Sequence, residues 1–359
     1  MDKPCQRQNP RLVISPKTGT MIVSICTKKS SPLYRGREGT TAVERRGERA
    51  RPLCEGARRR YQLVGAALLG YALLPLALGF FSLLGWEITS LLGGNAAPGD
   101  PSPAWQGAAG LLSALLSGAL PFWWLRRQLG LAPIWRRTQM PAGSWRRFGG
   151  RCLVLLGLNT LATAAAEALA GLLRGWGLAP VSPDFSLTGG APALFLLLTA
   201  VAAAPLVEEY AFRGVLLRAL APCGRRFAIV VSALLFALAH GNLLQGLPAF
   251  VIGLYLGYLA DQTGTPLYTA ALHLLNNAVA LALPLLEGGW ALLYLLVTAG
   301  SAAVAAVLYG GRLFCREAAL PPNDPAIPRE WRWPALLRSP AIWLALGYYL
   351  LNFILSTLP

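Results

Sequence analysis

The chain has 359 residues, of which 55% are hydrophobic and only 13% charged, and its mean hydropathy is +0.48. Soluble domains carry about 25% charged residues, so this composition excludes an ordinary soluble protein and predicts a polytopic membrane protein. The formal charge is +16, but beyond residue 60 the arginines lie almost entirely in short loops beside apolar segments, a distribution that indicates cytoplasmic loops and no nucleic-acid partner.

The first 60 residues carry 15 Lys or Arg against 5 acidic residues, are broken by Gly and Pro, and show no sustained hydrophobic period. Such a segment cannot bury an apolar core, so we expect residues 1–60 to form a disordered basic tail. A translation start placed too far upstream would give the same kind of sequence, with Met21 as one later candidate. The six cysteines are scattered singly, which predicts neither a disulfide framework nor a cysteine metal site.

From residue 61 onward, apolar runs long enough to cross about 30 Å of hydrocarbon recur between polar loops. We predict an all-α fold, a polytopic transmembrane helical bundle with about eight to nine spans. Residues 61–190 hold the first helices and an arginine-rich loop, residues 191–286 carry the polar motifs described below, and residues 287–359 hold the C-terminal helices. The expected spans are 61–84, 104–125, 152–173, 193–220, 227–241, 243–260, 267–286, 290–310 and 341–358.

The charges of the loops set the expected orientation, because cytoplasmic loops carry an excess of Lys and Arg. Residues 126–151 contain seven arginines and no acidic residue, whereas residues 85–103 contain neither Lys nor Arg. Counting spans from these loops places the basic turn at 222–226 and the N-terminus in the cytoplasm. The composition, rich in Gly, Ala and Arg and poor in Lys, is typical of a GC-rich bacterial genome. We therefore expect an integral protein of a bacterial cytoplasmic membrane, with membrane lipids as partners.

One predicted span contains charged residues that are costly in a bilayer. Glu208, Glu209 and Arg213 lie within six residues, and each ionised group near the midplane costs roughly 2.5–3.5 kcal/mol on insertion scales. Glu209 precedes Arg213 by four residues, the favourable order for an intrahelical ion pair. Because neighbouring residues point about 100° apart on a helix, this pairing leaves Glu208 free to face a cavity and to act as a general base toward water.

The two histidines of the chain lie in later predicted spans. His240 follows Phe236 by four residues and Asn277 follows His273 by four, so each pair shares one face of a helix. His273 and Asn277 are placed to donate hydrogen bonds to an oxyanion when a carbonyl group is attacked. Together with Glu208, these residues predict one buried hydrolytic site.

The turns allow the depths of these residues to be compared. Glu208 and His240 are equally far from the turn at 222–226, which predicts equal depth and lets both contact one water molecule. His273 lies only seven residues beyond the turn at 261–266. Straight vertical helices would leave His273 nearer the cytoplasm, so contact with Glu208 requires a tilted or broken helix.

A metal alternative stays open at this point. Zinc bound by Glu208, His240 and His273 would use a known set of two histidines and one glutamate, although the spacing is not that of a zinc protease helix. The sequence has no H-E-x-x-H, G-x-G-D or G-x-S-G motif and no lysine after Lys29, so other intramembrane hydrolase chemistries lack their residues. Because Glu, His and Asn supply a base and oxyanion donors, we expect no cofactor.

The motifs E-E-x-x-x-R, F-x-x-x-H and H-x-x-x-N, in this order on successive helices, resemble those of the CPBP family of intramembrane proteases, which includes CAAX prenyl endopeptidases and bacteriocin-processing proteins. The resemblance covers roughly residues 193–285. It implies an endopeptidase acting on a membrane-embedded or lipid-associated protein or peptide, in which Glu208 activates water with His240 as its partner, and His273 and Asn277 stabilise the oxyanion. The implied supporting residues are Glu209, Arg213 and Phe236.

Two other classes of function remain as alternatives. A non-catalytic bacteriocin immunity or peptide-binding membrane protein would have the same fold, although the intact set of Glu, His and Asn residues argues against it. A scaffold or transporter that used Glu209 and Arg213 as a gate would require inverted repeats, and the sequence contains none. The resemblance does not fix the substrate. Because nothing resembles a prenyl-recognition signature, we favour a membrane-associated protein or peptide, such as one with a C-terminal sorting tail.

Overall fold

A computed structural model describes residues 13–14, 21–22, 35–93, 99–134, 144–181, 190–283, 286, 288–318 and 326–359. The chain divides into two compact units, residues 1–51 and residues 52–359. The larger unit contains all of the polar motifs.

The smaller unit contains two short strands and the beginning of a long helix. Strand β1 (Val13–Ile14) pairs antiparallel with β2 (Met21–Ile22), and helix α1 (Arg35–Leu92) begins within this unit. The predicted disorder is therefore wrong for residues 35–60, which are helical. Thirteen of these 26 residues are Arg or Glu, which have high helix propensity. The rest of the predicted tail, apart from the two strands, lies outside the described residues.

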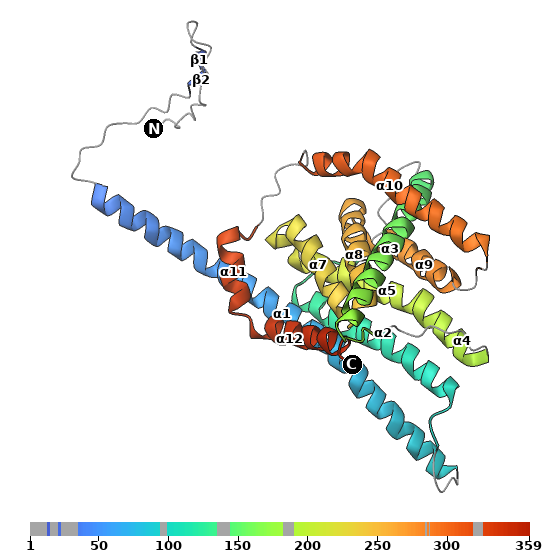
Figure 1. The fold of residues 1–359 in the computed structure, drawn as a ribbon. Helices are drawn as coiled ribbons and strands as arrows, with labels where there is room; N and C mark the ends of the chain where they lie inside the picture. The colour runs from blue at the N-terminus through green and yellow to red at the C-terminus, as the bar shows by residue number, and fades with distance from the viewer. Residues whose placement is uncertain are drawn as a thin grey trace. The chain divides into compact units, whose positions relative to one another are not determined.

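The larger unit is built from helices throughout its described residues, which confirms the all-α prediction (Figure 1). The segment 190–223 is a composite helix that changes its winding several times. Its parts are α4 (Gly190–Leu197), π-helix η2 (Leu198–Ala203), α5 (Ala204–Glu208), π-helix η3 (Glu209–Leu216), α6 (Leu217–Leu220) and 3₁₀-helix η4 (Ala221–Cys223). The other helices are α2 (Pro103–Gln128), α3 (Ser144–Gly175), α7 (Arg225–Ala239), α8 (Leu243–Thr263), α9 (Pro266–Ala282), α10 (Gly289–Ala318), α11 (Arg329–Leu337) and α12 (Pro340–Leu355).

Several helices are long and apolar enough to cross a membrane, so the chain is an integral membrane protein. Every predicted span coincides with a helix, whereas the short helix α11 was not predicted. Helices α7 and α9 have only 15 and 17 residues, and the predicted number of spans is thus approximate. In the described part of the chain, the five full-length candidates are Cys54–Leu92, Pro103–Gln128, Arg147–Gly175, Gly190–Cys223 and Leu243–Thr263.

Residues that favour turns or helix caps lie at the start of α7, at both ends of α8 and at the start of α9. Gly224, with φ of 114°, turns the chain into α7. The side chain of Asn242 caps α8 by accepting a hydrogen bond from the backbone N–H of Gln245 at 2.9 Å. Gly264 ends α8 in the left-handed conformation, and Pro266 occupies the first turn of α9.

Aromatic side chains from four helices pack beneath the polar motifs. The ring of Phe212 contacts the rings of Tyr71, Phe122 and Phe236 at centroid distances of 6.0, 5.7 and 5.0 Å. Phe212 and Phe236 lie equally far from Gly224 in the sequence, so their contact places the composite helix and α7 in the hairpin register that was predicted.

Close contacts between three pairs of helices complete the larger unit. Helix α3 packs against both α8 and α10, and a Cβ atom at Gly157 would lie only 2.2 Å from the carbonyl oxygen of Thr298 on α10. Helix α12 packs on α1, where the hydroxyl of Tyr349 donates a hydrogen bond to the Leu68 carbonyl oxygen at 2.9 Å. The side chain of Gln62 accepts one from the backbone N–H of Ala341 at 2.9 Å.

Candidate active site

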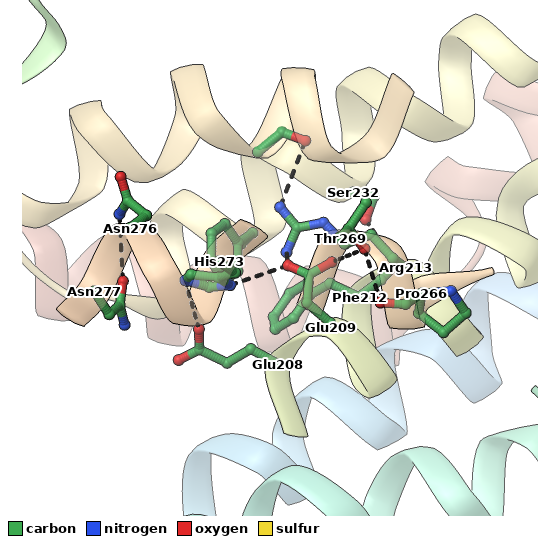
Figure 2. A network of polar contacts seen from close by, with 12 residues as sticks. Glu208, Glu209, Phe212, Arg213, Ser232, Pro266, Thr269, His273, Asn276 and Asn277 are labelled. Atoms are coloured by element: carbon green, nitrogen blue, oxygen red, sulfur yellow. Dashed lines mark hydrogen bonds and ion pairs between the residues drawn. The ribbon is translucent and has the colours of Figure 1, made fainter. Parts of the chain in front are cut away.

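Glu209 is the centre of the polar network between the composite helix and α9 (Figure 2). Its carboxylate is fully buried and lies 2.9 Å from Nη1 of Arg213, which forms the predicted ion pair. Thr269 Oγ1 donates a hydrogen bond to Glu209 Oε2 at 2.7 Å, and His273 Nδ1 donates one to Oε1 at 3.0 Å. Both carboxylate oxygens of Glu209 therefore already have partners.

Arg213 fixes this network to the neighbouring helices. Its guanidinium group lies over the ring of Phe236, 4.3 Å from the centroid, and Nη2 lies 3.5 Å from the carbonyl oxygen of Gly253. The side chain is only 1% exposed, so this cation depends on Glu209 for compensation of its charge. Phe236 thus holds Arg213 through its π-face, as well as filling the core.

Glu208 differs from its neighbour in having a carboxylate that is free of hydrogen bonds within the described residues. Its side chain is 15% exposed, and Oε2 lies 3.7 Å from Nε2 of His273. The imidazole of His273 therefore lies between the two glutamates, with Nδ1 toward Glu209 and Nε2 toward Glu208 (Figure 2). Because a carboxylate oxygen can only accept a hydrogen bond, the contact with Glu209 requires a proton on Nδ1 of His273.

The expected mismatch in depth between His273 and Glu208 is absent. One cavity is lined both by Arg213, Leu217 and Arg218 of the composite helix and by Thr265 and Pro266 at the start of α9. Ala221, next to the turn at 222–226, lines the same cavity, and Arg225 of that turn forms an ion pair with Asp261. The turn before α9 therefore lies beside the C-terminal part of the composite helix, and Thr269 in the first turn of α9 already contacts Glu209. The next turn of α9 brings His273 to Glu208.

Asn277 lies one turn beyond His273 on α9, but its side chain has its own partners (Figure 2). Its Nδ2 donates a hydrogen bond to the carbonyl oxygen of Ala200 at 2.9 Å, and its Oδ1 lies 3.3 Å from Nδ2 of Asn276. Asn276 is 4% exposed, and its Oδ1 is buried without a hydrogen-bond partner. The pair of asparagines is therefore an ordered arrangement with one unused acceptor.

His240 lies apart from the contact between Glu208 and His273. Its Nδ1 donates a hydrogen bond to the carbonyl oxygen of Phe236 at 2.8 Å, and its ring meets the Phe236 ring edge-on at 4.7 Å. Phe236 also contacts the ring of His273 at 5.9 Å. The proton on Nδ1 leaves Nε2 of His240 as the nitrogen that can accept a hydrogen bond.

The set of zinc ligands considered above is not assembled in this geometry. Within the described ranges, no group of three or more His, Cys, Asp or Glu residues is placed so that it could hold a metal ion. Glu208 and His273 approach each other, but His240 does not complete the set with them.

Three features of the site were missed by sequence reasoning. Thr269 lies four residues before His273, a spacing that could have placed it on the same helix face. The π-helices η2 and η3 adjoin α5 on both sides, and π-helices are frequent at functional sites. Pro205 was the available indication of irregular winding, because proline removes a backbone donor inside a helix. Asn276 carried no separate signal beside Asn277.

The segment that contains these residues matches a known protein family. Residues 190–279 match the family model described as "Type II CAAX prenyl endopeptidase Rce1-like". No curated protein and no solved structure matches the chain. The matched segment begins at α4 and ends within α9, and it includes Glu208, His240, His273 and Asn277. The resemblance to CAAX-type proteases is thereby confirmed for residues 190–279, which match the Rce1-like family model.

Proposed function

We propose that this chain is an intramembrane endopeptidase that hydrolyses a peptide bond of a membrane-associated protein or peptide. The Rce1-like domain supports a CAAX-type membrane endopeptidase. The observation that carries the proposal is the unequal environment of the two glutamates. Glu209 is neutralised by Arg213, whereas the partly exposed carboxylate of Glu208 lies 3.7 Å from His273 with no hydrogen bond of its own among the described residues.

In the proposed reaction, Glu208 is the general base. A water molecule bound between Glu208 and the histidines loses a proton to the carboxylate while its oxygen attacks the carbonyl carbon of the substrate. His240 accepts a hydrogen bond from this water through its unprotonated Nε2. When the tetrahedral intermediate collapses and the C–N bond breaks, Glu208 returns the proton to the leaving amine.

The oxyanion of the intermediate is stabilised by His273 and Asn277. In the imidazolium form, His273 donates from Nδ1 to Glu209 and from Nε2 toward the substrate. Asn277 uses one N–H of its amide for Ala200, which leaves the second N–H for the oxyanion. Two donors that are already oriented before the substrate binds lower the barrier without reorganisation.

The proposed setting is a bacterial cytoplasmic membrane, with the N-terminus and the turn at 222–226 in the cytoplasm. Glu208 is about 24 Å along its helix from that turn, at about 1.5 Å per residue, a depth that favours substrates with a membrane-embedded or lipid-anchored segment. We propose a protein or peptide with a C-terminal sorting tail as the first substrate class to test, and a prenylated tail as the second.

The test compares the protein termini in membranes of cells that produce the native chain or the Glu208→Gln variant. We expect termini from cleavage in or near membrane segments with the native chain, and their loss with Glu208→Gln at unchanged expression. Glu167→Gln is the matched control, because Glu167 on α3 is 54% exposed and, among the described residues, its ion-pair partner is Arg174 at 3.9 Å. Cleavage that continued with Glu208→Gln would refute the assignment of Glu208 as the general base. Identical proteomes, with protection from a peptide toxin by the native chain, would indicate an immunity protein instead.

A further inference from the structure

We propose that Pro205 is a positioning residue for Asn277, an inference that rests on the proposed oxyanion role of Asn277. The link between them is the carbonyl oxygen of Ala200, which accepts a hydrogen bond from Asn277 Nδ2 at 2.9 Å. A carbonyl inside a helix normally accepts from the backbone of its own helix. The winding of the composite helix explains why this carbonyl is available to a side chain of another helix.

Ala200 lies in η2, where each backbone N–H bonds to the carbonyl five residues earlier. The last such hydrogen bond runs from the N–H of Ala204 to the carbonyl oxygen of Thr199. The next bond in this register would run from residue 205 to Ala200. Residue 205 is proline, which has no N–H. The π-register therefore ends at this point, and the carbonyl of Ala200 is left without its backbone donor.

A backbone carbonyl without a hydrogen-bond partner is strongly unfavourable in an apolar membrane interior. Asn277 supplies that partner from α9, and the same contact fixes the orientation of its amide group. Only Nδ2 can meet a carbonyl oxygen, so Oδ1 must point the other way, toward Nδ2 of Asn276 at 3.3 Å. Because both the oxygen and the nitrogen of the Asn277 amide have partners, its second N–H is held in a single orientation. An oxyanion donor must be oriented in this way before the substrate binds.

Pro205→Ala would return an N–H to position 205, where it can bond to Ala200 and displace Asn277. The α-hydroxy analogue of alanine at the same position has the side chain of alanine but an ester oxygen in place of the N–H. It should therefore restore the native contact. Pro248→Ala is the matched control, since Pro248 is also buried inside a helix, α8, and none of the hydrogen bonds described above for the site involves the backbone carbonyl of Leu244, four residues earlier.

The geometry is tested without substrate by NMR of protein labelled with ¹⁵N in asparagine side chains. The Nδ2 resonance of Asn277 is the signal that disappears in Asn277→Ala. We expect this resonance to shift in Pro205→Ala, to return with the α-hydroxy analogue and to be unchanged in Pro248→Ala. An unchanged resonance in Pro205→Ala would overturn the proposal, as would a shift that persists with the α-hydroxy analogue, because the change would then come from the lost ring.

The consequence for catalysis is measured with an internally quenched peptide that spans the cleavage site found by the comparison of termini. Displacement of a catalytic group by about 1 Å costs about 10²-fold in rate, so we expect Pro205→Ala to lower kcat by about 10- to 100-fold at similar KM. Asn277→Ala should lower kcat by about 10²–10³-fold, and Pro205→Ala should then add no further loss. Independent losses would overturn the positioning role. Full activity of Asn277→Ala would instead refute the proposed oxyanion donor, whatever the NMR result.

Discussion

The buried ion pair between Glu209 and Arg213 gives a quantitative prediction for stability. Arg213→Met removes the positive charge while keeping a side chain of similar length, so the change isolates the charge from the volume. Glu209 would then be a buried carboxylate with only Thr269 and His273 as donors. Removing one partner of a buried pair costs about 3–5 kcal/mol, and the two remaining hydrogen bonds place the expected loss near the lower end, about 3 kcal/mol.

Arg225→Met provides the matched control. Arg225 forms an ion pair with Asp261 between α7 and α8, but the side chains of this pair are 33% and 24% exposed. Solvent screens such a pair, and its contribution is about 0–1 kcal/mol. The two substitutions are therefore chemically identical and differ in the burial of the ion pair that is broken.

The assay is thermal unfolding of the detergent-solubilised protein, followed by its tryptophan fluorescence. At about 2–4 °C per kcal/mol, Arg213→Met should lower Tm by roughly 6–12 °C and Arg225→Met by at most about 4 °C. Glu208→Gln should leave Tm nearly unchanged, because Glu208 makes no hydrogen bond in the part of the chain that the structure describes. Equal shifts for the two arginine variants would refute the assignment of Glu209 and Arg213 as the buried support of the site.

Three further predictions concern the metal, the basic tail and the packing of α3. Turnover should persist in a strong chelator, because the proposed reaction takes its base and its hydrogen-bond donors from Glu208, the histidines and Asn277. Stoichiometric metal whose removal stops turnover would contradict this. Deletion of residues 1–51, a separate unit, should leave insertion and cleavage intact, whereas an inserted but inactive truncation would assign the tail a role in recruiting substrate or lipid. Gly157→Ala should lower Tm, because the added Cβ would meet Thr298 O at 2.2 Å and overpacking costs about 1–3 kcal/mol. The control Gly171→Ala on the same helix has nothing within 4 Å and should not lower Tm.

The sequence was sufficient to locate the helices, because an apolar run of about 20 residues must form its backbone hydrogen bonds internally in lipid. It also predicted the pair of Glu209 with Arg213, since a four-residue offset is a local property of a helix. The level of the turn before α9 could not be predicted, because hydropathy reports burial in lipid and gives no depth. For this reason, the contact between Glu208 and His273 was the least expected part of the site.

Pro205 indicated irregular winding in the composite helix, but the π-register itself could not be predicted from composition and spacing, for a different reason. A π-register is selected only when contacts with other helices compensate for the poorer hydrogen bonding, and here one such contact comes from Asn277, far along the chain. The tautomers of the histidines could not be predicted either, since they depend on which acceptor forms a hydrogen bond with each Nδ1. Phe236 illustrates the point: its ring could be placed beside His240, but the use of its carbonyl oxygen could not.

The pairing of α1 with α12 has a consequence for the order in which the protein is assembled. Tyr349 and Leu68 are joined by a hydrogen bond across 281 positions of the chain. At about 5–20 residues per second, the ribosome needs roughly 14–56 s to progress from one to the other. For that interval α12 does not yet exist, so the surface of α1 that α12 later occupies must contact something else, such as lipid or a membrane insertase.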